Sequence, residues 1–277
     1  MAAEDEHGYE SRVCRQVLGA FEGFVPATVA ARRLPAPPIF ERHVALDLSL
    51  PPHLALASAN PGWEDVTVHA FSLRADLARP LNRRLRALAL ELERAGDGLN
   101  VSNVGAFHSR PLASDTPRAL AKLRNAAARA ARAAHADEQG ARVDRPRRPS
   151  SLWCNVSRGD HYHGLHDHAG AVWSGCYYPA RVPAAARAGA WSGRIAFRTA
   201  VGGLPDGLLP AGATGRPCAV DPDRPEGWCA YATVEPAPGL MLVWPSWLLH
   251  CVLPVGAIDG AFPPRPRVSY SFNFGES

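Results

Sequence analysis

The sequence has a single lysine, Lys122, so its positive charge comes almost wholly from arginine. Thirty Lys and Arg against 26 Asp and Glu give a formal net charge of +4, and the arginines are spread along the chain. A nucleic-acid-binding protein typically gathers its basic residues on one face or in one block. The scatter therefore argues against nucleic acid as a partner.

The chain also lacks a long apolar run. No uninterrupted stretch reaches the roughly 18 to 20 apolar residues that cross a bilayer. A secretory signal begins with a basic region followed by an apolar segment. The first ten residues of this chain are acidic instead. We therefore expect a cytoplasmic protein with no membrane partner.

Cysteine pairs with metal-binding or redox spacing are absent as well. The six cysteines show no Cys-x-x-Cys motif, and several lie in apolar runs, where a free thiol packs as a small hydrophobic group. We expect them to be reduced and mostly structural.

The two parts of the chain differ in pattern. Residues 1–60 contain proline-rich pieces without clear periodicity, and we expect an N-terminal extension of unclear structure there. Residues 61–277 are expected to form a single domain. Within it, residues 61–140 would supply helical support, because apolar residues recur at helical spacing over 82–95 and 116–136.

Residues 150–277 change to short β segments separated by glycine and proline. This pattern, with no intervening helical periodicity, is typical of a sandwich, barrel or jelly roll. Two stretches rich in Ala, Gly and Pro, residues 179–190 and 202–227, are expected to be surface insertions. The predicted strands are 151–157, 171–179, 191–199, 228–234, 240–244, 247–254 and 267–274.

Histidines cluster just before the second of these strands. His166 and His168 stand two apart, so both would point to the same face of an extended strand and could hold one metal ion. His161 and His163 form a competing pair with the same spacing. His250 lies in an apolar run, where a lone histidine is more often a core residue, and it gains weight only as a third ligand.

The last predicted strand, residues 267–274, alternates strictly between polar and apolar residues. On an ordinary surface strand the polar face would simply meet water. If the strand belongs to a barrel with a metal inside, Arg267 and Ser269 would project into the lumen, and a buried guanidinium requires an anionic partner. A dicarboxylate would supply that anion.

Five segments, in this order, resemble the 2-oxoglutarate/iron(II) oxygenase family: Trp-Cys-Asn-Val at 153–156, His-Asp-His at 166–168, Ser-Gly-Cys-Tyr-Tyr at 174–178, Pro-Ser-Trp-Leu-Leu-His at 245–250, and Arg-Val-Ser-Tyr-Ser-Phe-Asn-Phe at 267–274. The resemblance implies a mainly β fold with a double-stranded β-helix core, a jelly roll of the cupin-like kind, with flanking helices. It also implies Fe(II) as cofactor and 2-oxoglutarate and O2 as co-substrates. The implied metal ligands are His166, His168 and His250, and the implied co-substrate residues are Arg267, Ser269, Asn155 and Tyr177.

The ligand set departs from the usual one of the larger superfamily, which has two histidines and a carboxylate. His168 stands where that carboxylate is expected, and Asp167 or Asp160 could replace a histidine only if the chain bends to bring it in. Three neutral imidazoles would leave the metal charge uncompensated, which favours an anionic co-substrate. The same set would also suit a three-histidine dioxygenase that uses none.

The expected function is therefore an Fe(II)- and 2-oxoglutarate-dependent dioxygenase that hydroxylates an unidentified substrate and releases succinate and CO2. No catalytic residue beyond the metal centre is expected. Two alternatives remain: a three-histidine non-haem metal dioxygenase without 2-oxoglutarate, and a catalytically inactive jelly-roll binding module.

Overall fold

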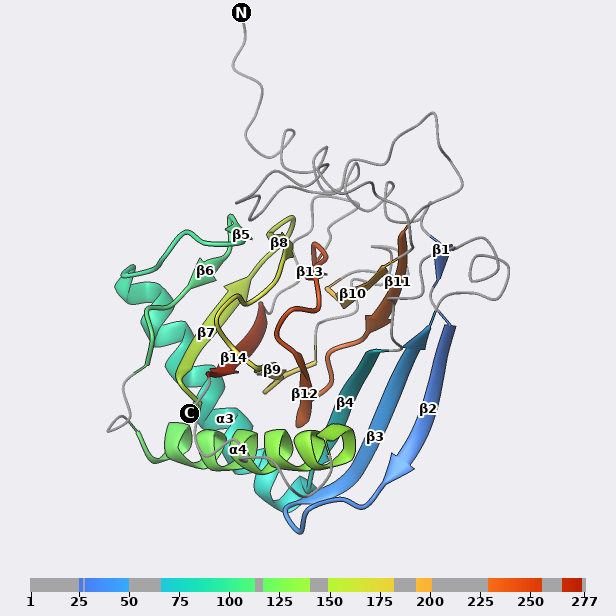
Figure 1. Ribbon diagram of the computed structural model, residues 1–277. Helices are drawn as coiled ribbons and strands as arrows, with labels where there is room; N and C mark the ends of the chain where they lie inside the picture. The colour runs from blue at the N-terminus through green and yellow to red at the C-terminus, as the bar shows by residue number, and fades with distance from the viewer. Residues whose placement is uncertain are drawn as a thin grey trace, which may run out of the picture.

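The computed structural model is arranged in three layers (Figure 1). Helices α3 (Ala75–Ala95) and α4 (Arg118–Gln139) cover one face of an eight-stranded sheet, and a six-stranded sheet packs against the other face. The structure describes residues 25–26, 28–49, 66–112, 117–139, 149–181, 193–200, 229–255 and 266–275.

Each sheet contains strands that are far apart in the sequence. All neighbouring strands are antiparallel except β1 and β11. In order across the larger sheet lie β2 (Thr28–Leu34), β3 (Phe40–Ser49), β4 (Val66–Leu73), β12 (Leu240–Pro245), β9 (Trp173–Tyr177), β14 (Arg267–Phe274), β7 (Ser151–Ser157) and β6 (Phe107–His108). Across the smaller sheet lie β1 (Val25–Pro26), β11 (Cys229–Val234), β10 (Ile195–Ala200), β13 (His250–Val252), β8 (Tyr162–His166) and β5 (Asn103–Val104).

The eight strands from β7 to β14 form a double-stranded β-helix. The chain crosses between the sheets as it proceeds, so that β7, β9, β12 and β14 form the centre of the larger sheet and β8, β10, β11 and β13 that of the smaller one. Apolar side chains from the facing surfaces fill part of the space between the sheets. The predicted jelly-roll fold is confirmed.

Both predicted helices are present, with different ends. The first begins at Ala75 rather than at residue 82 and continues through Pro80, burying Leu81, Leu85 and Ala89 at a spacing of four. It ends at Gly96, whose φ of 76° is a left-handed conformation that glycine adopts without strain. The second helix buries a row of small alanines, which allows it to lie close to the sheet. No helix in the described ranges is long and apolar enough to cross a membrane.

Part of the N-terminal region joins the main sheet. Strands β2 and β3 lie within residues 1–60, for which the sequence predicted no defined structure, and they extend the larger sheet beyond β4. The predicted division between residues 60 and 61 falls outside the described residues. So do the predicted insertion at 202–227 and most of the one at 179–190.

Gly175 in the middle of β9 is required by close packing. A methyl group at this position would overlap both the Phe272 ring and the main-chain oxygen of Leu242. We expect Gly175→Ala to lower the free energy of unfolding by about 1–3 kcal/mol, because the strand has to shift to admit the methyl. Chemical denaturation of Gly175→Ala beside Gly275→Ala, where the methyl would meet nothing closer than 3.7 Å, measures this. Equal stability of the two variants would contradict the packing argument.

A buried histidine pair links the larger sheet to α4. His43, 2% exposed, donates from Nδ1 to the main-chain oxygen of Pro35 at 3.2 Å, and its Nε2 lies 3.1 Å from Nδ1 of His69. His69 Nε2 in turn lies 3.5 Å from a carboxylate oxygen of Glu138. Burial lowers the pKa of His43 to about 4, so this imidazole is neutral in the folded protein at neutral pH.

The lowered pKa of His43 predicts loss of stability in acid. The unfolded chain takes up a proton near pH 6.5, while the folded protein resists until about pH 4, so the free energy of unfolding falls as pH drops through that window. In His43→Gln the fall should be shallower by up to about 1.4 kcal/mol per pH unit. Urea denaturation at several pH values between 4 and 7 tests this, and an unchanged slope would contradict it.

Candidate functional site

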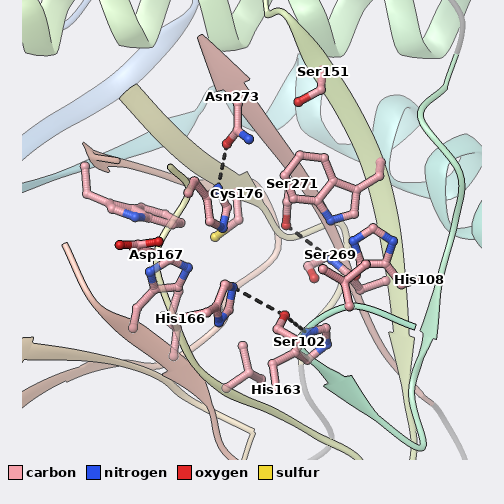
Figure 2. A pocket seen from close by; sticks show the side chains of 18 of the residues that line it. Ser102, His108, Ser151, His163, His166, Asp167, Cys176, Ser269, Ser271 and Asn273 are labelled. Atoms are coloured by element: carbon pink, nitrogen blue, oxygen red, sulfur yellow. Dashed lines mark hydrogen bonds between the residues drawn. The ribbon is translucent and has the colours of Figure 1, made fainter. Parts of the chain in front are cut away.

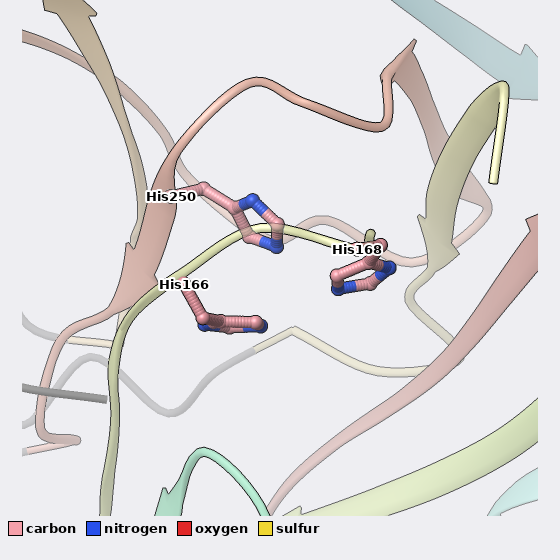
Figure 3. Close-up of side chains that lie close together, drawn as sticks. All are labelled: His166, His168 and His250. Atoms are coloured by element: carbon pink, nitrogen blue, oxygen red, sulfur yellow. The ribbon is translucent and has the colours of Figure 1, made fainter. Parts of the chain in front are cut away.

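Three histidines converge where the two sheets open. One ring nitrogen from each of His166, His168 and His250 lies within 4.8 Å of the other two, and Figure 3 shows the three rings facing a common centre. His166 is the last residue of β8 and pairs directly with His250, the first residue of β13. Two of the three predicted residues, His166 and His250, are thus brought together from neighbouring strands of the smaller sheet.

His168 reaches the cluster by a different route from the predicted one. The prediction placed it on the same extended strand as His166, but β8 ends at His166 and His168 lies beyond it. Its main-chain N–H donates to the oxygen of Ser246 at 3.0 Å, which holds this segment against the turn before His250. The path of the chain after β8, rather than strand alternation, therefore directs the His168 ring toward the other two histidines.

Hydrogen bonds fix which ring nitrogen of each histidine is available. Nδ1 of His166 donates to the oxygen of Gly164 at 2.7 Å, and Nδ1 of His250 donates to that of Leu248 at 2.9 Å. Nδ1 of His168 donates to a side-chain oxygen, Oδ1 of Asn273, at 2.6 Å. With the proton on Nδ1, each ring presents the lone pair of Nε2, the arrangement that a metal-binding histidine needs.

Burial keeps the three rings uncharged. It lowers the pKa of His166 to about 4, lowers that of His168, and lowers that of His250 well below its ordinary value. Neutral imidazoles are the form that binds metal. The cluster thus offers three neutral nitrogen donors at neutral pH.

The competing candidates do not join this cluster. His163 lines the same pocket but lies outside the group of converging nitrogens, while the imidazole of His161 accepts a hydrogen bond from the main chain of Arg158. Among the described residues, neither Asp160 nor Asp167 contributes an oxygen to the cluster. Asp167 is exposed at the pocket lining (Figure 2).

A cavity of about 370 Å³ extends from the histidines between the sheets. One wall is polar because alternate residues of β14 and β7 point into it, while the other residues of β14 pack into the core beneath the helices. From the inner end to the outer end of β14 these residues are Arg267, Ser269, Ser271 and Asn273, paired across the strands with Ser157, Asn155, Trp153 and Ser151.

Arg267 is a buried cation in this cavity. It is 2% exposed, donates from Nε to the oxygen of Gly193 and from Nη1 to Oγ of Ser269, each at 3.1 Å, and lies 5.3 Å from the Tyr178 ring centre. Within the described ranges no carboxylate pairs with it. A buried guanidinium without an anion is costly, so its free donors are suited to an acidic ligand.

Further buried polar atoms line the cavity near Arg267. Nε2 of His163 lines the cavity, is buried, and forms no hydrogen bond with any described residue, while the buried Tyr178 hydroxyl lies beside Arg267 and Cys176. His163 stands three residues before His166, and a register shift against β13 lets both face the cavity.

Of the four predicted co-substrate residues, three line the cavity. Arg267, Ser269 and Asn155 do so, and the Asn155 side-chain amide donates to Oγ of Ser271 at 3.2 Å, while its side-chain oxygen has no partner among the described residues. The prediction for Tyr177 is wrong in position: its ring packs on the helix side and its hydroxyl donates to Asn82 at 2.5 Å. Successive residues of a strand face opposite sides, and Tyr178 is the one that lines the cavity.

The sequence did not identify several residues of this cavity. Ser102 places its hydroxyl 3.4 Å from Nε2 of His166 and 3.4 Å from Nδ1 of His163. His108 stacks on Trp153, with ring centres 5.5 Å apart, and Trp153 lies 5.6 Å from His168. Trp153 stands two residues before Asn155 on β7, so strand alternation could have identified it as a cavity residue. Ser102 and His108 reach the cavity only through the pairing of β5 with β8 and of β6 with β7, which the sequence does not show.

A double-stranded β-helix that combines converging neutral histidines with a buried, unpaired arginine has the features of a protein that binds one metal ion and a small acid. Residues 151–273 match the family described as "Putative 2OG-Fe(II) oxygenase". The match covers somewhat less than half of the chain and confirms the resemblance seen in the sequence, which is to a family of oxidoreductases.

The fold also resembles solved structures of low identity. A prolyl-4-hydroxylase from Pseudomonas putida is 16% identical, with a TM-score of 0.46 over 75% of this chain and 92% of that one. The non-heme alpha ketoglutarate dependent carbocyclase SnoK from nogalamycin biosynthesis is 14% identical, with a TM-score of 0.44 over 74% of this chain and 79% of that one. No curated protein is similar enough to count as a match.

Proposed function

We propose that the chain is an Fe(II)- and 2-oxoglutarate-dependent dioxygenase in which His166, His168 and His250 hold the iron and Arg267 binds the far carboxylate of 2-oxoglutarate. The observation that carries this proposal is the buried Arg267, which has no anionic partner among the described residues and faces the same cavity as the three histidines. The family match of residues 151–273 supports it.

The residues present fit both groups. Imidazole nitrogen is a suitable ligand for iron, and three protein ligands leave three of six coordination positions for the co-substrate and O2. The three neutral imidazoles do not offset the metal charge, whereas the two carboxylates of 2-oxoglutarate would. Ser269, hydrogen-bonded to Arg267, and the Tyr178 hydroxyl, which lines the same cavity, would hydrogen-bond the far carboxylate.

The proposed reaction consumes one O2 and one 2-oxoglutarate for each substrate C–H bond that becomes C–OH, and releases succinate and CO2. Bound iron would supply the activation of dioxygen. The protein's own residues bind and orient: Arg267 and Ser269 hold the acid, and aromatic side chains such as Trp244 and Tyr178 wall the cavity from water. Because the cavity draws on residues from 101 to 273, we propose that the span 61–277 works as one domain.

Formation of succinate tests this function without knowledge of the substrate. Protein reconstituted with Fe(II) is incubated in air with 2-oxoglutarate, and succinate and O2 are followed together. We expect slow succinate release with matching O2 uptake, dependent on added iron. Absence of succinate under all conditions, with iron bound, would contradict the proposal.

The second candidate is a three-histidine metal dioxygenase that uses no acidic co-substrate. It is favoured by one observation, the lack of a carboxylate among the converging ligands of the described residues. It predicts O2 uptake with a suitable substrate whether or not 2-oxoglutarate is present. It also assigns no role to Arg267 in turnover, which the variants in the Discussion test.

A further inference from the structure

The three histidines differ in what orients them. His166 and His250 donate from Nδ1 to main-chain oxygens two residues earlier, so their ring planes are set by the local backbone. His168 instead donates to a side chain, Oδ1 of Asn273, more than a hundred residues away, and this is the shortest of the three bonds at 2.6 Å. The orientation of the His168 ring therefore depends on the side-chain amide of Asn273, which a mutation can remove.

Asn273 is itself held in place on both its main chain and its side chain. Its main-chain oxygen accepts from the N–H of Ser150 at 2.7 Å, and its Oδ1 accepts from Oγ of Ser174 at 2.9 Å as well as from His168. Ser174 is fully buried and lies directly opposite Asn273 across the β9–β14 pair.

Two donors converge on the same amide oxygen, and this has a consequence for His168. If the amide NH2 group faced the ring instead, Nδ1 would have to act as acceptor and the proton would move to Nε2, where it would occupy the lone pair that a metal needs. Ser174 favours the amide oxygen on this side because its hydroxyl can donate there. The pair thus sets both the ring plane and the tautomer of His168.

We propose that Asn273 is a positioning residue that keeps His168 in the metal-binding tautomer and orientation, and that Ser174 fixes the amide of Asn273 for this purpose. The inference rests on the proposed metal site. It assigns roles to two residues, the serine of the Ser-Gly-Cys-Tyr-Tyr segment and the asparagine of the last strand, that the proposed function leaves without one. Strand β14 would then serve both ends of the cavity, with Arg267 for the acid and Asn273 for the metal.

Loss of an outer partner of a metal-binding histidine typically weakens metal affinity 10- to 100-fold. Asn273→Ala removes the acceptor and should show this loss. Asn273→Asp keeps an oxygen in the same place and adds negative charge, so affinity should return to the wild-type level or exceed it. Ser174→Ala leaves the acceptor but frees the amide to turn, and we expect a smaller loss, below about 10-fold.

The test is titration of the metal-free full chain with Co(II), followed by its visible absorption, with dissociation constants from competition with a chelator. Ser271→Ala is the matched control, because Ser271 lies on the same face of β14 but bonds Asn155 instead of a histidine of the cluster. We expect Ser271→Ala to bind within about twofold of wild type. Far-UV circular dichroism checks the fold of each variant.

Wild-type affinity in Asn273→Ala would overturn the inference while leaving the metal site intact. Equal losses in the Asp and Ala variants would also overturn it, because a merely structural effect predicts no rescue by a carboxylate. Should Asn273→Ala fail to fold, Asn273→Asp and Ser174→Ala still decide the matter: wild-type affinity in Ser174→Ala with a large loss in Asn273→Asp would contradict the proposed roles. A wild-type chain that binds no Co(II) would overturn the proposed metal site itself.

Discussion

Replacement of Arg267 by alanine should raise the KM for 2-oxoglutarate by at least about 30-fold. Removing one partner of a buried charge pair costs about 2–5 kcal/mol, which corresponds to factors from about 30 to several thousand. The acid would lose its counter-charge in a cavity where no other described cation is placed to replace it. Succinate formation measured against 2-oxoglutarate concentration gives the effect.

Two variants separate this role from a general loss of charge. Arg267→Lys keeps a cation but loses the planar fork, so its KM should lie between those of wild type and Arg267→Ala. Arg194→Ala removes an arginine that pairs with Thr233 and Glu235 instead of lining the cavity, and it should leave KM within about twofold. An unchanged KM in Arg267→Ala would favour the candidate function without an acidic co-substrate.

Replacement of His166 by alanine should weaken iron binding by more than about 100-fold. Loss of a ligand should exceed the 10- to 100-fold cost of disturbing an outer partner. Two imidazoles would remain, and among the described residues no carboxylate lies in the cluster to replace the lost His166 ligand. Anaerobic reconstitution followed by a colorimetric iron assay measures the bound metal.

His108→Ala is the matched control for His166→Ala. His108 lines the same cavity and stacks on Trp153, but it lies outside the converging nitrogens, so its variant should keep one iron per chain. Full iron content in His166→Ala would contradict the assigned ligand set. Asp167, exposed at the cavity lining, would then be the first alternative to examine by Asp167→Asn.

The sequence predicted the strands and helices that have one polar and one apolar face, and it missed strands whose two faces are alike. One face of strand β14 lines the cavity and the other packs in the core, so its alternation of polar and apolar residues could be recognised in the sequence. Strand β2 lies at the edge of the larger sheet with its described side chains mostly exposed, so it carries no apolar period. The joining of β2 and β3 to the sheet follows from pairing between strands, which no local pattern reports.

The same reasoning explains the outcome at the candidate site. Strand β9 is buried on both faces, so its sequence does not show which residues face the cavity. The prediction therefore named Tyr177, although Tyr178 lines the cavity. The histidines were found through their spacing and the family resemblance, although a bend rather than a strand aims His168. The partnership of His168 with Asn273 depends on strand register across the sheet and could not be read from either segment alone.

The measurement that tests the account most directly is anaerobic titration of the Fe(II)-loaded protein with 2-oxoglutarate, followed by visible absorption. We predict a metal-to-ligand charge-transfer band that reaches its plateau at one equivalent of 2-oxoglutarate and is strongly weakened in Arg267→Ala. One bound iron without any such band would contradict the account, because the acid and the metal would then not share the cavity between Arg267 and the three histidines.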